Sequence, residues 1–112
     1  MILTEERIIT QTENSVALEF SVPDVSPYFD GHFPDFSILP AVAQVDLILR
    51  LSSRYLGIGV GLSEIRRIKF SSLIRPFTPL FLFLEKNGET ISFKMTSPDR
   101  QTVYSLGTLK SA

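Results

Sequence analysis

Residues 41–56 read AVAQVDLILRLSSRYL, a run without glycine or proline that Gly57 ends. The run is mostly apolar and is long enough for about four helical turns. No other stretch of the sequence predicts a helix as clearly. An apolar helix must be covered by another element, so the remaining sequence has to supply a surface for it.

Short strands are expected on both sides of this helix. Val16, Leu18 and Phe20 alternate with less apolar residues, which puts three apolar side chains on one face of a strand. Asn87-Gly88, between two apolar runs, is the clearest hairpin signal. The expected strands are residues 2–10, 15–22, 59–71, 79–86, 90–97 and 101–109. The order predicts an α+β fold, with an antiparallel sheet of about five to six strands wrapped around one long central helix.

The chain has the length of one compact domain. Its 112 residues show no break in composition, so residues 1–112 are expected to form a single domain. One sheet of this kind leaves two edge strands unpaired, and pairing two sheets edge to edge would hide them. We therefore expect a dimer.

Composition excludes several classes of protein. Apolar residues make up 44% of the chain, enough for a core or an apolar tunnel, and the net charge of −1 gives no global field that would recruit nucleic acid or an anionic membrane. The absence of cysteine excludes disulfides, thiolate nucleophiles and cysteine zinc sites. The N-terminus does not resemble a signal peptide, and no apolar run reaches the ~20 residues of a membrane helix, so a cytoplasmic location is expected.

Acid–base chemistry near neutral pH has one candidate side chain, because His32 is the only histidine and cysteine is absent. His32 lies in the segment from Pro23 to Pro40, which holds four prolines and is expected to be a stiff loop. A lone histidine is more often an ordinary surface or hydrogen-bonded residue than a catalyst. The stiff loop favours a functional role, because it holds the side chain in place without core packing.

The sequence around this histidine resembles a known family. Gly31-His32-Phe33-Pro34, Pro40 eight residues after the histidine and Asp46 six residues further on are similar to the hotdog-fold 3-hydroxyacyl-acyl-carrier-protein dehydratases. Residues 38–46 look most like the short dehydratases of aryl-polyene-type clusters, and Ile68-Lys69-Phe70 and Arg75-Pro76 extend the similarity weakly. The resemblance covers the middle two-thirds of the chain.

The resemblance implies an activity and its site residues. It implies dehydration of 3-hydroxyacyl-acyl carrier protein to trans-2-enoyl-acyl carrier protein, in fatty acid or aryl-polyene-type biosynthesis, without cofactor or metal. His32 would take the proton from C2, Asp46 would deliver a proton to the departing 3-hydroxyl, and the backbone N–H of Ala41 would bind the thioester oxygen. An unpaired helix N–H and the positive end of the helix dipole suit the developing enolate charge.

Aromatic and basic side chains suggest where the acyl chain and the carrier would bind. A substrate tunnel is expected along Phe33, Phe36 and Pro40. Phe81 and Phe83 are expected in the core, where the aromatic residues of a small β-rich domain usually lie. The densest basic stretch is a candidate docking patch for acidic acyl carrier protein, or equally the solvent face of a strand; it consists of Arg66, Arg67, Lys69 and Arg75.

Departures from the family pattern keep other functions open. Asp35, Ala41 and Phe77-Thr78 stand where the family has glycine, glycine and Gly-Asp. They favour a second hypothesis, a non-catalytic hotdog subunit that pairs with an active dehydratase. An acyl thioesterase is a third, because hotdog hydrolases also use a helix carboxylate and helix N-terminal amides. Asp46 also fits a solvated helix stripe, since Arg50 follows it four residues later.

Overall fold

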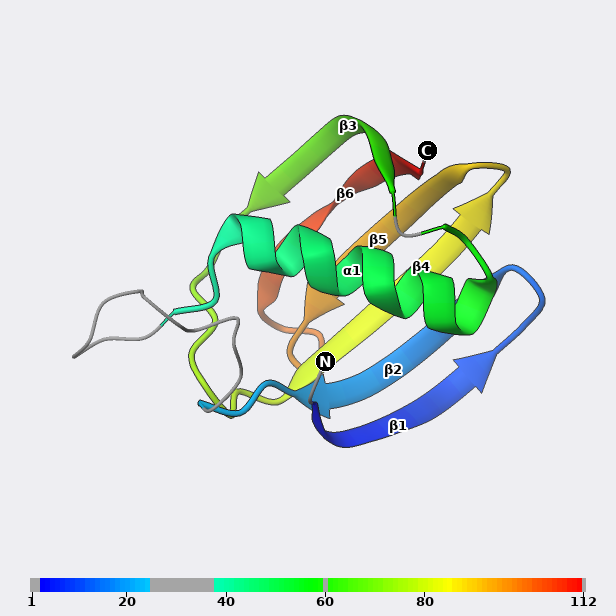
Figure 1. The fold of residues 1–112 in the computed structure, drawn as a ribbon. Coiled ribbons are helices and arrows are strands. Elements are labelled where there is room, and N and C mark those ends of the chain that lie inside the picture. The colour runs from blue at the N-terminus through cyan, green and yellow to red at the C-terminus, as the bar shows by residue number, and fades with distance from the viewer. Residues whose placement is uncertain (1–2, 25–37, 60, 112) are drawn as a thin grey trace.

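The structure is a computed structural model that describes residues 3–24, 38–59 and 61–111. The described residues form β1 (Thr4–Gln11), β2 (Ser15–Ser21), α1 (Ala41–Leu56), β3 (Leu62–Phe70), β4 (Leu80–Asn87), β5 (Thr90–Thr96) and β6 (Val103–Ser111). The strands make one antiparallel sheet in the order β1-β2-β4-β5-β6-β3, and α1 lies across one of its faces (Figure 1). Each expected strand and the expected helix are therefore confirmed, with ends shifted by a few residues.

The core lies between α1 and the face of the sheet that the helix covers. Leu47, Ile48 and Leu51 of α1 are fully buried, as their spacing of one helical turn requires. The alternation expected in β2 is confirmed, because Val16 and Leu18 are fully buried in the same cluster. Leucine and isoleucine side chains of β4, β5 and β6 complete this core: Leu80, Leu82, Leu84, Ile91 and Leu109.

The helix ends where the sequence indicates. Gly57 adopts a left-handed backbone conformation with φ of 69°, which costs glycine little, and its N–H donates to the carbonyl of Ser53 at 3.1 Å. The fully buried hydroxyl of Ser52 donates to the carbonyl of Ile48 at 2.7 Å, so this polar group inside the core is satisfied. The expected β4–β5 hairpin is also confirmed, with Asn87 opposite Thr90.

The outer face of the sheet, turned away from α1, overturns one expectation. Side chains alternate along β4, so Leu82 and Leu84 point toward the helix and Phe83 points outward. Phe83 is 38% exposed, and its expected place in the core is wrong. Phe81 also belongs to the outer row but is only 8% exposed, because the guanidinium of Arg100 lies 4.0 Å from the centre of its ring.

Both edge strands of the sheet expose apolar side chains. On β3 these are Leu62, Ile65 and Phe70, which are 40%, 53% and 42% exposed. The other edge, β1, exposes Ile8 and Ile9. An edge strand that carries apolar side chains is a surface on which another strand can pair. Within the described ranges, no helix is long and apolar enough to cross a membrane.

Candidate active site

The N-terminal end of α1 is the first part of the candidate site. Pro40 precedes the helix in an extended conformation, and among the described residues no side chain caps this end. The first amide groups of a helix have no acceptor inside the helix and lie at the positive end of its dipole. Ala41, the first helical residue, is exposed, and the binding of a thioester oxygen by its N–H group stays a prediction.

Gln44 is part of this end and was not singled out from the sequence. Its side chain is 3% exposed, and its amide nitrogen donates to the carbonyl of Leu39 at 3.1 Å. The N–H of Leu39 in turn donates to the carbonyl of Ile74 at 2.7 Å, so the segment before the helix is held on both sides. Among the residues that the structure describes, the buried side-chain oxygen of Gln44 has no hydrogen-bond partner. The available signal was a polar residue on the side of the helix that carries Leu47, Ile48 and Leu51.

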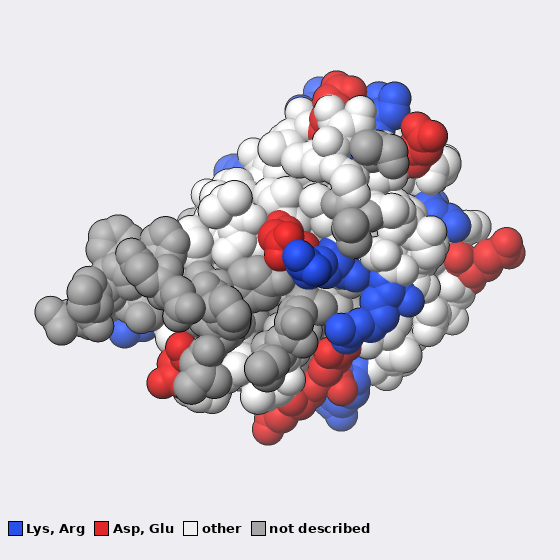
Figure 2. Space-filling view, viewed as in Figure 1, with Lys and Arg blue, Asp and Glu red and all other residues white. Residues whose placement is uncertain are grey.

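Asp46 lies little more than one helical turn beyond the exposed N-terminus. Its side chain is 44% exposed and accepts a hydrogen bond from Nε of Arg50 at 2.9 Å. In the single chain, Asp46 therefore takes part in the helix ion pair that was the alternative interpretation of this residue. Figure 2 shows acidic atoms over α1 next to a stripe of basic atoms. His32, the expected partner of Asp46, lies outside the described residues, as do Phe33 and Phe36.

An apolar groove runs between the first turns of α1 and the edge strand β3, whose last residues lie beside the start of the helix (Figure 1). Its volume is about 310 Å³. Val42, the most exposed of its large apolar residues, is 74% exposed. The groove is lined by Ala41, Val42, Val45, Leu62, Ile65, Ile68 and Phe70. The groove thus begins at the first residue of the helix and continues onto the edge strand β3, which pairs with β6 on one side only.

The basic residues of the candidate docking patch do not share one environment. Arg67 and Lys69 stand opposite Thr108 and Leu106 of β6, in the rows that face away from α1. Arg66 lies 3.6 Å from the carboxylate of Glu64 and is partly neutralised by it. Arg75 is exposed on the loop that follows β3, next to the Ile74 carbonyl that holds Leu39. Arg75 thus follows directly on the residue that bonds to the segment before the helix.

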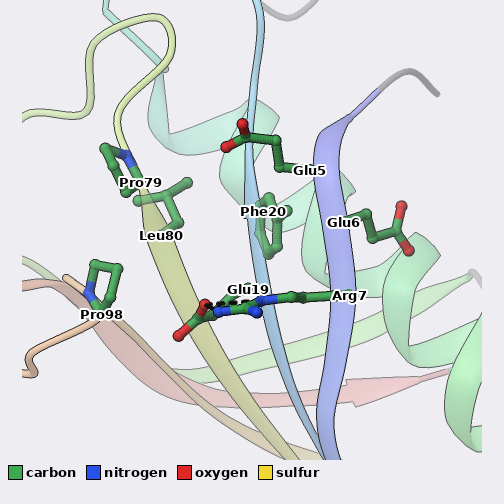
Figure 3. A pocket seen from close by; sticks show the side chains of 8 residues that line it. All are labelled: Glu5, Glu6, Arg7, Glu19, Phe20, Pro79, Leu80 and Pro98. Atoms are coloured by element: carbon green, nitrogen blue, oxygen red, sulfur yellow. Dashed lines mark hydrogen bonds and ion pairs between the residues drawn. The ribbon is translucent and has the colours of Figure 1, made fainter.

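A larger cavity of about 450 Å³ opens near β1, β2 and the start of β4 (Figure 3). None of the described residues expected in the active site lines it. In Figure 3, the side chain of Glu5 lies on the side of β1 that faces Phe20, and the side chain of Glu6 lies on the other side. The side chains of Arg7 and Glu19 face each other. Nη2 of Arg7 lies 2.6 Å from the carboxylate of Glu19, so the charges of this pair largely cancel.

The C-terminal end of α1 is held by a different set of contacts. One guanidinium nitrogen of Arg54 donates to both carboxylate oxygens of Glu6, at 3.1 and 2.8 Å, and the hydroxyl of Tyr55 donates to the same carboxylate. The hydrogen bond to Glu6 raises the pKa of Arg54 further above its usual value. Burial, and then the hydrogen bond to Glu6, raise the pKa of Tyr55. These contacts join the helix to β1 and leave Asp46 outside them.

Comparisons with solved structures agree with this architecture. The chain is similar to a chain of the dehydratase heterocomplex ApeI:P from Xenorhabdus doucetiae, with a TM-score of 0.78, 23% identity and coverage of 96% of this chain and 97% of that chain. An uncharacterised protein from Erwinia carotovora subsp. atroseptica is 28% identical, with a TM-score of 0.73 and coverage of 98% and 95%. Thioesterase superfamily member 2 of zebra fish shares the fold at 12% identity, with a TM-score of 0.67 and coverage of 96% and 80%.

These similarities confirm the hotdog fold expected from the sequence. No curated protein matches the sequence. The family model for ApeI-like dehydratases, described as ApeI dehydratase, matches residues 8–108 and so includes the histidine loop, α1 and the strands after it. The resemblance to short dehydratases of the aryl-polyene type is thereby confirmed. The chain belongs to the ApeI-like dehydratase family.

Proposed function

We propose that the chain is a hydro-lyase that removes water from 3-hydroxyacyl groups carried on acyl carrier protein. The observation that carries the proposal is the position of Asp46 on α1, whose first turn has no side-chain cap within the described residues and lines an apolar groove. A thioester oxygen, a proton donor and an acyl chain need these three features within a few ångströms of one another. Membership of a dehydratase family supports the same reaction.

The proposed reaction divides two proton transfers between two side chains. Neutral His32 accepts the proton from C2, and the electrons of that C–H bond form the C2=C3 double bond. The C3–O bond breaks as the protonated carboxyl group of Asp46 gives its proton to the hydroxyl, which leaves as water. During this step negative charge gathers on the thioester oxygen, where the N–H of Ala41 and the helix dipole stabilise it.

A dimer formed through β3 would complete the site. Asp46 is 44% exposed in one chain, and a second surface that covers it would exclude water from the reacting groups. The apolar groove ends on β3, whose exposed Ile65 and Phe70 would be buried if β3 of a second chain paired with it. We propose that His32 of one chain then faces Asp46 of the other across the tunnel, which Phe33, Phe36 and Pro40 help to line.

Carrier docking is proposed at the basic residues near the tunnel. An acyl carrier protein is acidic, and a local basic patch would steer it in spite of the net charge of −1 of this chain. Arg75 is the strongest member, because it sits beside the segment that leads into α1. Arg66, Arg67 and Lys69 extend the positive potential along β3.

The test is an assay that separates enoyl formation from thiol release, with a 3-hydroxyacyl-acyl carrier protein as substrate. The wild-type chain is expected to produce the enoyl thioester, and His32→Ala and Asp46→Asn each to lower kcat at least about 100-fold. Glu13→Gln, a carboxyl group removed from the exposed β1–β2 turn, is the matched control and should retain activity. Free thiol without enoyl product would indicate a thioesterase, and full activity of Asp46→Asn would refute the proposed proton donor.

A second candidate function is a subunit that works only in a mixed dimer. The ion pair between Asp46 and Arg50 favours it, because the carboxylate is already engaged within its own helix at 2.9 Å. The similar chain from Xenorhabdus doucetiae belongs to a dehydratase heterocomplex. The purified chain would then show no turnover alone, and activity would appear on addition of a second hotdog protein, with Asp46→Asn harmless in the mixture.

A further inference from the structure

We propose that the outer face of the sheet carries a second ligand site, for a small amphipathic carboxylate. The site is a cavity of about 300 Å³ on β4, β5 and the turn after β5. It is lined by Phe81, Phe83, Lys94, Thr96 and Arg100. Because α1 covers the opposite face of the sheet, this cavity is separated from the candidate active site by the sheet itself (Figure 1).

Two phenylalanine side chains make the floor of this cavity apolar. Phe81 and Phe83 are in the same outward row of β4, and Thr96 stands opposite Phe81 on β5. The hydroxyl of Thr96 is occupied, since it donates to the carbonyl of Ser97 at 2.8 Å. Phe83 is 38% exposed and gains free energy when an alkyl or aryl group covers it, whereas Arg100 already covers Phe81.

Two cations stand at the border of the aromatic floor. Lys94 is opposite Phe83 in the strand register, and the guanidinium of Arg100 stacks 4.0 Å from the centre of the Phe81 ring. Within the described ranges, neither cation has a carboxylate within the 4.0 Å of an ion pair. One guanidinium nitrogen of Arg100 donates to the carbonyl of Pro98 at 3.2 Å, which orients the group over the ring. A carboxylate between Lys94 and Arg100, beside the exposed ring of Phe83, would meet both positive groups.

The turn that carries Arg100 is held together by the carboxylate of Asp99. Asp99 accepts hydrogen bonds from the hydroxyl of Ser97 at 2.6 Å and from the N–H of Gln101 at 3.0 Å. These bonds hold the pKa of Asp99 below its usual value. Arg100 itself has φ of 62°, a left-handed conformation in which a non-glycine residue is uncommon. The turn therefore fixes the guanidinium while its one carboxylate is used internally.

The remaining acidic groups near the cavity leave its potential positive. Glu19 is opposite Phe81 on β2, but Arg7 holds its carboxylate at 2.6 Å. Glu85 follows Phe83 in the outward row of β4 and is exposed to solvent, where screening weakens its effect. Lys94 and Arg100 thus face one exposed carboxylate and one already paired, and an anion is favoured over a cation.

The size and charge of the cavity favour a small molecule over a second copy of the chain. About 300 Å³ is at the lower limit of ordinary small-ligand sites. Two copies related by a twofold axis through this face would bring Lys94 and Arg100 of one chain against the same residues of the other, which like charges oppose. An alkyl carboxylate of medium length would place its chain on the exposed ring of Phe83 and its head group between the two cations.

The test is an NMR titration of the full chain with octanoate, octanamide and inorganic sulfate. Octanoate is expected to shift the resonances of Phe81, Phe83, Lys94 and Thr96 in a saturable way. Octanamide, which has the same chain without the charge, should bind at least about tenfold more weakly. Sulfate, which has the charge without the chain, should give no saturable shift of the aromatic rings.

Arg100→Gly is the most informative variant. It removes the guanidinium and suits the φ of 62°, so the turn should stay folded while octanoate affinity falls about tenfold or more. Lys94→Ala should also weaken binding. Lys110→Ala removes the same charge from β6, outside the cavity, and should bind octanoate like the wild type.

Three outcomes would overturn the proposal. One is the absence of saturable shifts on the outer face at millimolar octanoate, and another is equal affinity for octanamide, which would leave Arg100 as a cover for Phe81. The third is unchanged octanoate affinity in folded Arg100→Gly. Shifts around Ala41 and Ile68 that survive in this variant would belong to the groove beside α1, so the two sites are distinguished. The result does not depend on the proposed enzymatic activity.

Discussion

The two ends of α1 differ in how their backbone groups are used. At the C-terminal end, Gln11 of β1 donates to the carbonyl of Tyr55 at 3.1 Å, and Lys86 of β4 donates to the carbonyl of Leu56 at 3.3 Å. Gly57 adds a backbone bond to Ser53. At the N-terminal end, no described side chain bonds to the amide groups of the first turn.

The C-terminal end of α1 thus fixes the helix on the sheet, and the N-terminal end is the one proposed to bind a ligand. Backbone groups at a helix end that are buried without a hydrogen-bond partner cost free energy. The C-terminal carbonyls of α1 accept hydrogen bonds from side chains of two strands, β1 and β4. Within the described ranges no side chain occupies the N-terminal amides, and the segment before them is fixed through Leu39 instead. A helix held at one end can present the other to a ligand without moving. The proposed oxyanion site depends on this arrangement.

The largest expected effect concerns the buried side chains that hold both ends of α1 on the sheet. Leu47 is fully buried in the middle of α1, so Leu47→Ala is expected to lower the free energy of unfolding by about 2–5 kcal/mol. Urea unfolding monitored by circular dichroism measures this change. Val42→Ala, at a position 74% exposed, is the matched control and should change the stability by less than about 0.5 kcal/mol. Similar losses for both variants would show that α1 is not held by its buried stripe.

A side chain that caps the N-terminal end of α1 should stabilise the helix and lower the rate of enoyl formation. Asp at position 40 would cap the free amide groups, so Pro40→Asp is expected to raise the stability of the helix by about 0.5–2 kcal/mol. The same carboxylate would occupy the proposed oxyanion position, and enoyl formation should fall about 100-fold. Pro40→Ala, which offers no cap, is the control for the loss of proline. Full activity of a stabilised Pro40→Asp variant would exclude these amides from the reaction.

Much of the fold could be predicted from the sequence, because local signals decide it. Pro40 and Gly57 bound the helix, and the alternation of apolar residues bounds the strands. The direction of Phe83 was missed, because the apolar run of β4 gives no alternation from which to decide which side chains face α1. The contact between Glu6 and Arg54 joins residues 48 positions apart, and no local pattern contains such a pair.

The candidate site was predictable only in part. The position of Asp46 on α1 follows from the helix pattern, and so does its ion pair with Arg50, since residues four apart share a helix face. Those two facts support opposite functions, and the sequence does not choose between them. Gln44 was missed because one polar residue in an apolar run is compatible with either burial or exposure, and only its bond to Leu39 decides.

The contacts that hold the C-terminal end should contribute modestly and should not affect turnover. Arg54 is 47% exposed and Glu6 20% exposed at the side chain, so their coupling energy is expected to be below about 1 kcal/mol. A double-mutant cycle with Glu6→Gln and Arg54→Gln measures it. Arg7 and Glu19, which pair at 2.6 Å on the outer face, provide the matched cycle. A loss of enoyl formation in Glu6→Gln, with the fold intact, would contradict the separation of the two ends.

The smallest expected effect is a dependence on pH at the same end. The pKa of Tyr55 is raised by burial and by its hydrogen bond to Glu6, so the folded chain keeps this proton at a pH where the unfolded chain begins to lose it. The resulting stability is fully present below the ordinary tyrosine pKa of about 10 and is lost as the pH rises through the higher folded value. The difference in free energy of unfolding between wild type and Tyr55→Phe, measured from pH 8 to about 11, should therefore shrink above pH 10. Tyr104→Phe removes a tyrosine from β6 as the control. If the difference for Tyr55→Phe grew with pH instead, the hydroxyl would have to be stabilised as the anion, and its hydrogen bond to the Glu6 carboxylate would be ruled out.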